Sequence, residues 1–128
     1  LVNCMVHIRR HFEQALDENK AMAQHALTQI QHLYKIERLC DEANLSADER
    51  KTKRNELARP IMEAMKLWME TEGIKYSESS QIGKAITYAY TRWDNMMHYL
   101  DDGRLHLDNN LAYPNFSFIP TFQSSCCA

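Results

Sequence analysis

Apolar side chains recur at three- and four-residue steps along most of this chain, which is the spacing of amphipathic helices. The first stripe starts at residue 1 and comprises Leu1, Met5, Ile8, Phe12, Ala15 and Leu16. The second predicts a helix over 20–43 and comprises Ala23, Ala26, Leu27, Ile30, Leu33, Tyr34 and Cys40. No cap precedes the first stripe, so we expect the chain to continue a longer sequence.

A third helix is predicted to begin at Ser46, because Ser46 and Glu49 have the spacing of a capping box. Its first half is the charged run 48–56, which we expect to be solvated, and its apolar face starts later. That face comprises Leu57, Ile61, Ala64, Met65 and Trp68. Pro60 lacks a backbone donor and predicts a kink or break near 57–59, while Gly73 is predicted to end the helix.

A fourth helix is predicted to follow a cap at Ser77, Ser79 or Ser80. Its apolar face comprises Ile82, Ile86, Ala89, Tyr90, Trp93, Met97 and Leu100, and its solvent face comprises Lys84, Thr91, Arg92 and Asp94. Gly83 lies inside this helix, and its missing side chain predicts either the close approach of another backbone or local mobility of the helix.

The period falls from 3.6 to two after Gly103, where Leu105 and Leu107 alternate with polar residues. This alternation predicts a half-buried strand. The expected fold is therefore all-α, an antiparallel bundle of about four helices with a short C-terminal strand or extended tail.

Composition narrows the class of protein. The chain has 128 residues, 45% of them hydrophobic, which suffices for the core of one domain. There is no apolar run of membrane-spanning length and no signal-peptide pattern. Cys4 and Cys40 lie in helical patterns and Cys126 and Cys127 are adjacent, so we expect a cytoplasmic protein with free thiols. A net charge of -2 predicts that any DNA binding is weak.

Two groups of residues have the composition of metal ligands. Cys4, His7 and His11 occupy one helical face and could present three ligands to zinc, but a fourth is missing and ordinary hydrogen bonding is favoured. The acidic residues 101, 102 and 108 lie too close in sequence to supply alone the converging carboxylates of two-metal chemistry. We therefore predict no metal site.

Two motifs resemble the C-terminal catalytic region of insertion sequence 66 family transposases. The first reads CxxHxRRxF over 4–12, and the second reads YAxxRWxxxxxYLxDGRLxxDNNxA over 88–112. The family-motif residues are Cys4, His7, Arg9, Arg10, Phe12, Tyr88, Arg92, Trp93, Asp102, Gly103, Asp108, Asn109 and Asn110.

The resemblance implies an Asp-Asp-Glu transposase, a class of enzyme that transfers DNA strands with bound metal ions. In that family a Glu-Arg pair follows the DNN-x-Ala segment, whereas Tyr113 and Pro114 stand here. Both catalytic Asp positions would fall before residue 1. We therefore expect an inactive transposase fragment with no catalytic residues and no cofactor, since magnesium is expected only for an intact transposase.

The same resemblance divides the chain at residue 108. Residues 1–108 would be the helical region, and 109–128 a non-homologous apolar tail that is either a frameshift product or an extension that packs on the helices. Arg9, Arg10, Arg92 and Arg104 match basic positions of the family and could face DNA, although solvation is the ordinary role of such side chains.

A helical protein-protein interaction module is the alternative function. Under either interpretation we expect a homodimer, because a second copy would cover the apolar edges of Leu105 and Leu107 and the Phe-rich tail. We expect neither a membrane nor a small-molecule substrate as a partner.

Overall fold

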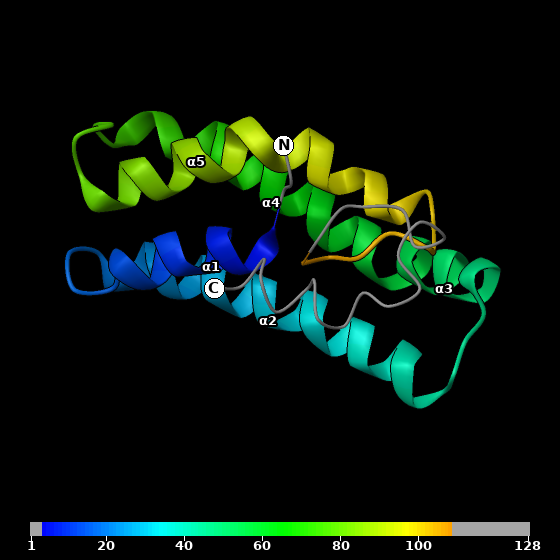
Figure 1. Cartoon of the computed structure of the whole chain (residues 1–128). Coiled ribbons are helices and arrows are strands. Elements are labelled where there is room, and N and C mark those ends of the chain that lie inside the picture. The colour runs from blue at the N-terminus through cyan, green and yellow to red at the C-terminus, as the bar shows by residue number, and fades with distance from the viewer. Residues whose placement is uncertain (1–3, 109–128) are drawn as a thin grey trace.

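The computed structural model describes residues 4–108 and confirms the all-helical fold. Its helices are α1 (Met5–Gln14), α2 (Lys20–Glu42), α3 (Ala47–Lys53), α4 (Arg59–Glu72) and α5 (Gln81–Met96). A π-helical turn, Arg54–Ala58, joins α3 to α4, and 3-10 turns follow α4 (Gly73–Lys75) and α5 (Met97–Leu100). With α3 and α4 taken as one interrupted helix, the described residues form the four main helices that the periodicity predicts (Figure 1).

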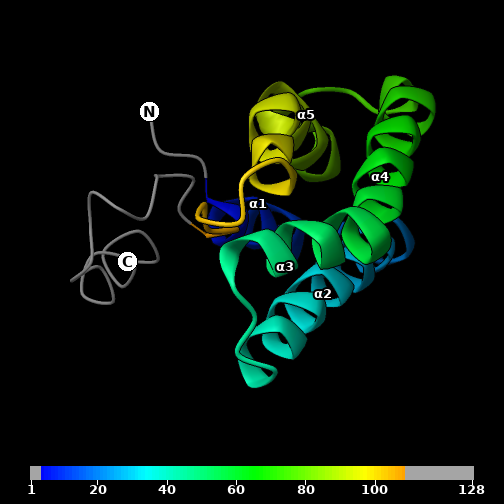
Figure 2. The same ribbon diagram turned by 90° about the vertical axis from the view of Figure 1, so that its right-hand side faces the viewer.

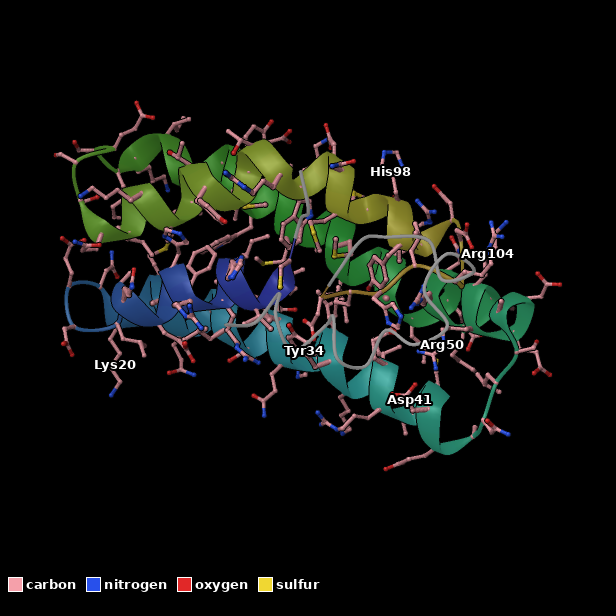
Figure 3. All side chains as sticks on the ribbon, viewed as in Figure 1. Lys20, Tyr34, Asp41, Arg50, His98 and Arg104 are labelled. Atoms are coloured by element: carbon pink, nitrogen blue, oxygen red, sulfur yellow. The ribbon has the colours of Figure 1, made fainter. Side chains whose placement is uncertain are left out.

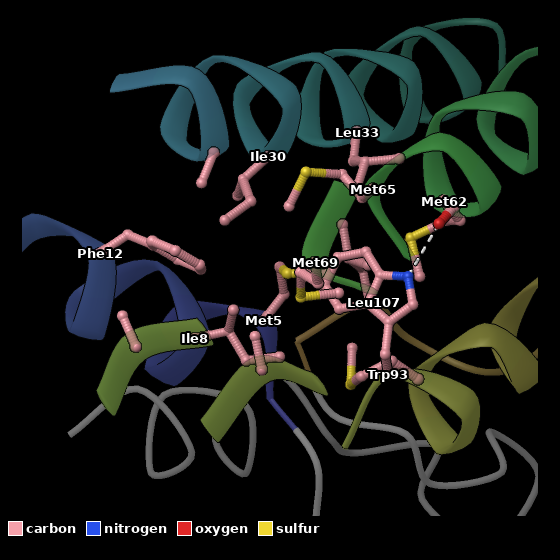
Figure 4. Close-up of a cluster of buried hydrophobic side chains, with 14 of the residues drawn as sticks. Met5, Ile8, Phe12, Ile30, Leu33, Met62, Met65, Met69, Trp93 and Leu107 are labelled. Carbon is pink, nitrogen blue, oxygen red and sulfur yellow. Dashed lines mark hydrogen bonds between the residues drawn. The ribbon is translucent and has the colours of Figure 1, made fainter. Parts of the chain in front are cut away.

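The helices pack as two layers that share one core. α1 contacts both α5 and α2, and α4 contacts α2 and α5 on the other side of the molecule (Figures 1 and 2). The core surrounds Trp93, which is fully buried and donates its indole N–H to the carbonyl oxygen of Met62 at 2.8 Å (Figure 4). Its other large members include Met5, Ile8, Phe12, Ile30, Leu33, Met62, Met65 and Met69. The predicted stripes of the first two helices supply five of these eight side chains.

The predicted face of the third helix was partly wrong. Leu57 and Ala64 are exposed, while Met62 and Met69, which the predicted face omits, are buried. The difference arises because apolar side chains occur on opposite sides of this helix, so their spacing alone does not identify the buried side. Tyr90, expected on the apolar face of the fourth helix, is likewise exposed and bonds Glu70 instead.

The predicted helix ends are confirmed. Ser46 and Glu49 form both bonds of the capping box. Ser80 is the cap of α5, where its hydroxyl accepts from the N–H of Gly83 at 3.0 Å. Gly83 is there for packing, because a Cβ at this position would overlap the carbonyl group of Ser77.

The predicted strand was wrong, since residues 4–108 contain no strand. Residues 104–108 instead form a turn followed by bends beside the start of α1, where the Leu107 carbonyl accepts from the N–H of Met5 at 3.3 Å. Leu107 is buried and Leu105 is half-buried. The alternation of apolar and polar residues therefore reflected the burial of these leucines and not hydrogen bonding to another strand. The first turn of a helix has free N–H groups but not the continuous row of donors and acceptors that a strand requires.

Across residues 4–108, no helix has the length and apolar character needed to span a bilayer.

Candidate functional site

The acidic turn and the segment after it, residues 101–108, are held by side chains of two other helices. This segment contains most of the second family motif and leads to position 113. It follows the last turn of α5, and its backbone lies against α3, where a Cβ on Gly103 would overlap the carbonyl group of Ala47. Only glycine therefore allows this approach between the segment and α3.

Arg54 is the centre of the site, and it is only 1% exposed. Its guanidinium binds the Glu37 carboxylate through two N–H groups, at 3.0 and 2.8 Å. The remaining bonds go to backbone carbonyl oxygens, namely Tyr99 at 2.7 Å, Asp102 at 3.2 Å and Leu105 at 2.9 Å. One side chain thus joins α2, the π-helical turn and the acidic segment.

The charge of Arg54 is compensated where it is buried. Glu37 lies opposite it and also accepts from Arg50 at 2.9 Å, while Arg50 reaches Asp41 with its other amino group. The guanidinium of Arg54 also lies 4.7 Å from the ring centre of Tyr99. Arg50 and Asp41 lie side by side at the edge of this network, between α2 and α3 (Figure 3).

Asn55 and Arg59 also form hydrogen bonds that hold the acidic turn and the residue before it. The Asn55 amide donates to the carbonyl oxygen of Leu100 at 2.7 Å, and Arg59 donates to the Asp101 carboxylate at 2.9 Å. A helix leaves its last carbonyl groups without intrahelical partners. Arg54 and Asn55 satisfy two of these at the end of the 3-10 turn, so the π-helical turn serves as its C-terminal cap.

The aspartates of the segment lie in opposite electrostatic environments. Arg104 binds the Asp102 carboxylate at 2.8 and 3.0 Å and lowers the pKa of Asp102 to about 2. Asp108 accepts a hydrogen bond from the Tyr34 hydroxyl, and burial raises the pKa of both groups. The two carboxylates therefore have separate partners and do not converge.

A pocket of about 290 Å³ lies between the segment and α2. Arg38, Arg50 and Arg54 line it together with Glu37, Asp41 and Asp108, so its charges are mixed. Within 4–108, no three His, Cys, Asp or Glu side chains are grouped to hold a metal ion. This geometry fixes a backbone segment in place.

The remaining motif residues lie elsewhere. Phe12 and Trp93 are core residues. Cys4 is buried at the start of α1, whereas His11 stacks on the Tyr88 ring, with 4.0 Å between ring centres, and its pKa is lowered by burial. Asn109, Asn110 and Tyr113 lie outside the described residues.

The four arginines predicted to face DNA do not share one environment. Arg9 lies over the Tyr34 ring at 5.1 Å, Arg92 over the Tyr88 ring at 3.7 Å, and Arg104 binds Asp102. Arg10 is exposed on α1. DNA contact by these arginines stays a prediction.

Sequence reasoning missed Arg54, Glu37 and Asn55. Arg54 and Asn55 were included in the charged run that we expected to be solvated. One signal could have identified Arg54, because residues 54, 58, 62, 65 and 69 follow helical spacing and all are buried. An arginine that continues a core stripe predicts a buried ion pair.

Comparisons with known proteins agree with the motifs. The family described as "Transposase IS66 family" matches residues 1–113. The uncharacterized protein y4hP of Sinorhizobium fredii is 32% identical over 122 residues, which cover 85% of this chain and 22% of that protein. The uncharacterized protein y4qI of the same organism is 32% identical over 114 residues, covering 88% of this chain and 21% of its own. This chain thus spans about a fifth of the length of these relatives. No solved structure matches it.

Proposed function

This chain belongs to the IS66 transposase family, and we propose that it acts as a helical scaffold of such a transposase without catalysing strand transfer itself. The observation that carries the scaffold role is the set of Arg54 bonds to the carbonyl oxygens of Tyr99, Asp102 and Leu105. They fix the backbone that leads to the position of the family glutamate.

The lack of activity rests on one residue. In the family pattern a glutamate follows DNN-x-Ala, and Tyr113 stands at that position. A neutral phenol does not replace a carboxylate that bridges metal ions, and losing such a ligand removes much of the electrostatic stabilisation of the transition state. Asp101, Asp102 and Asp108 offer no substitute, because they are paired separately with Arg59, Arg104 and Tyr34.

A plasmid-nicking assay with magnesium or manganese tests the lack of activity. We expect no turnover above a heat-killed sample, while an intact family member of full length serves as the positive control. Nicking that rises with the concentration of this chain, and that survives a further purification step, would overturn the proposal.

Hydrogen exchange tests the scaffold role. In the protein with Arg54→Met, we expect amides 103–107 to exchange faster than those of α2, because the segment loses its anchor while the helix keeps its own bonds. Arg38→Met is the matched control, since Arg38 lines the same pocket but is exposed. Equal protection of 103–107 in both variants would contradict the role.

The helical interaction module remains the second candidate. Leu67 on α4 and Ile74 in the 3-10 turn after it favour it, because these large apolar side chains are 61% and 85% exposed. Weak DNA binding is a separate proposal that rests on the net charge of -2 and on the partners that Arg9, Arg92 and Arg104 have within the chain. A gel-shift titration in which affinity falls steeply with salt would support DNA contact, and no shift at low salt would dismiss it.

A further inference from the structure

α4 carries two apolar faces. One face contains the methionines at 62, 65 and 69 and is buried in the core. The opposite face is exposed and carries Pro60, Ala64, Leu67 and Thr71. Together with Leu57 in the π-helical turn before α4 and Ile74 in the 3-10 turn after it, these residues form what we call the outer stripe. A helix that is apolar on opposite sides is normally covered on both. Figure 2 shows α4 at the edge of the bundle, with α1, α2 and α5 all to one side of it.

The outer stripe has the period of a coiled coil. Its residues follow one another at steps of three, four, three, four and three, the a and d positions of a heptad. Leu67 and Ile74 occupy d positions, and the smaller Ala64 and Thr71 occupy a positions. A second helix can therefore lie along the α-helical part of this face, from Pro60 to Thr71, over about 1.7 heptads.

Polar residues beside the outer stripe indicate which helix fits. Glu63 and Glu70 occupy the g positions of this heptad, and Lys75 occupies an e position. In a parallel pair, g residues face e residues of the partner helix, so Glu70 meets Lys75 of a second copy. In an antiparallel pair, g faces g, so Glu63 would meet Glu70. The charges thus favour a parallel pair of this chain.

We propose that the outer stripe of α4 is a homodimer interface, at which a second copy lays its own α4 alongside in parallel. This places the interface away from Leu105 and Leu107, where the sequence predicted it, because Leu107 is already buried within one chain. The interface is independent of any catalytic role. It is short, so we expect a dissociation constant on the order of 10 to 100 µM.

Sedimentation of the whole chain over a range of concentrations tests the interface. The protein should pass from monomer to dimer as concentration rises, and Leu67→Glu should weaken association at least tenfold, because it buries a charge without a partner. Leu39→Glu is the matched control, since Leu39 on α2 is 47% exposed and lies outside the outer stripe. Circular dichroism checks that both variants keep their helices. A monomer at every concentration, or a dimer that Leu67→Glu leaves intact, would overturn the proposal.

Disulfide cross-linking tests the parallel arrangement. On a background with Cys126→Ser and Cys127→Ser, both L67C and I74C should cross-link, because every d position meets its own copy in a parallel pair. An antiparallel pair would join at most the position nearest its two-fold axis. Cross-linking of one variant alone would therefore overturn the parallel arrangement, and cross-linking of L39C to the same extent would show random collision and overturn the interface.

Discussion

Trp93 and Arg54 are the two largest fully buried side chains among residues 4–108, and they stabilise the protein in different ways. Trp93 packs against methionines and aliphatic side chains that approach it from several directions, and it makes one hydrogen bond, to Met62. Arg54 makes five hydrogen bonds through its rigid, planar guanidinium group. We therefore expect a change of side-chain shape in the apolar core to cost much less unfolding free energy than the loss of the Arg54 guanidinium from its network.

Arg54→Met should have the largest effect. Methionine keeps much of the volume but leaves Glu37 and the carbonyl groups of the segment without their donor, and breaking a buried ion pair costs about 3–5 kcal/mol of unfolding free energy. Urea unfolding measures it, with Arg38→Met as the exposed control. A loss below about 1 kcal/mol would show that the network is weaker than its geometry indicates.

Gly103→Ala should destabilise the protein by about 2–3 kcal/mol, because the new Cβ would overlap the backbone of Ala47 and overpacking costs of this order follow. Gly73→Ala is the comparison, because its Cβ would meet the Cγ2 methyl group of Ile86 at 2.8 Å and no backbone atom, and Gly73 has a helical φ of -61°. Thermal unfolding of both variants measures the difference. Equal melting temperatures would contradict the close approach of the segment to α3.

Trp93→Phe should cost about 1–2 kcal/mol, less than Arg54→Met although tryptophan is the larger residue. Phenylalanine keeps most of the apolar contact, while the core loses some volume and one hydrogen bond. Urea unfolding gives the value directly. A larger loss of unfolding free energy for Trp93→Phe than for Arg54→Met would contradict the expected difference between the apolar core and the Arg54 network.

The Asp102–Arg104 pair should give a smaller effect that depends on pH. Because Arg104 lowers the pKa of Asp102 to about 2, the unfolded chain binds this proton more tightly than the folded one. The pair therefore contributes its stability above the ordinary aspartate pKa, and this contribution is lost as pH falls towards 2. We expect the difference between wild type and Asp102→Asn, under about 1 kcal/mol at neutral pH, to shrink in acid. A difference that grows in acid would be contrary to the pairing.

Tyr99→Phe should have the smallest effect, between none and about 1 kcal/mol of added stability. The Tyr99 hydroxyl is buried with no hydrogen-bond partner in the part of the chain that the structure describes, and its ring can still carry the Arg54 guanidinium when it is phenylalanine. Thermal unfolding is sensitive enough to detect the change. A clear destabilisation would reveal a partner for the hydroxyl.

The periodic elements were predictable because a helix places every third or fourth residue on one face. The stripes through Met5, Ile8 and Phe12 and through Ile30 and Leu33 are buried as expected. The capping box at Ser46 was predictable too, since it needs only residues that are neighbours in sequence. The family motif likewise identified residues 101–108 as the segment of interest without any structure.

The Arg54 network was not predictable in the same way. Glu37 lies 17 residues before Arg54, and Leu105 lies 51 residues after it, so no local pattern connects them. The charged run around Arg54 resembles a solvated turn, because burial of one arginine depends on partners that only folding brings near. The alternation at Leu105 and Leu107 was also ambiguous, since a strand exists only where another strand pairs with it.

By itself the sequence determined the helices, their caps, the family and the segment that carries its motif, because these depend on periodicity and on residues close along the chain. Only the tertiary structure decided which face of α4 is buried, that Arg54 holds the acidic segment, and that Leu67 and Ile74 stay exposed. The physical reason is that apolar side chains lie on opposite sides of α4. Which side is buried depends on packing against distant elements and not on the residues of α4 alone.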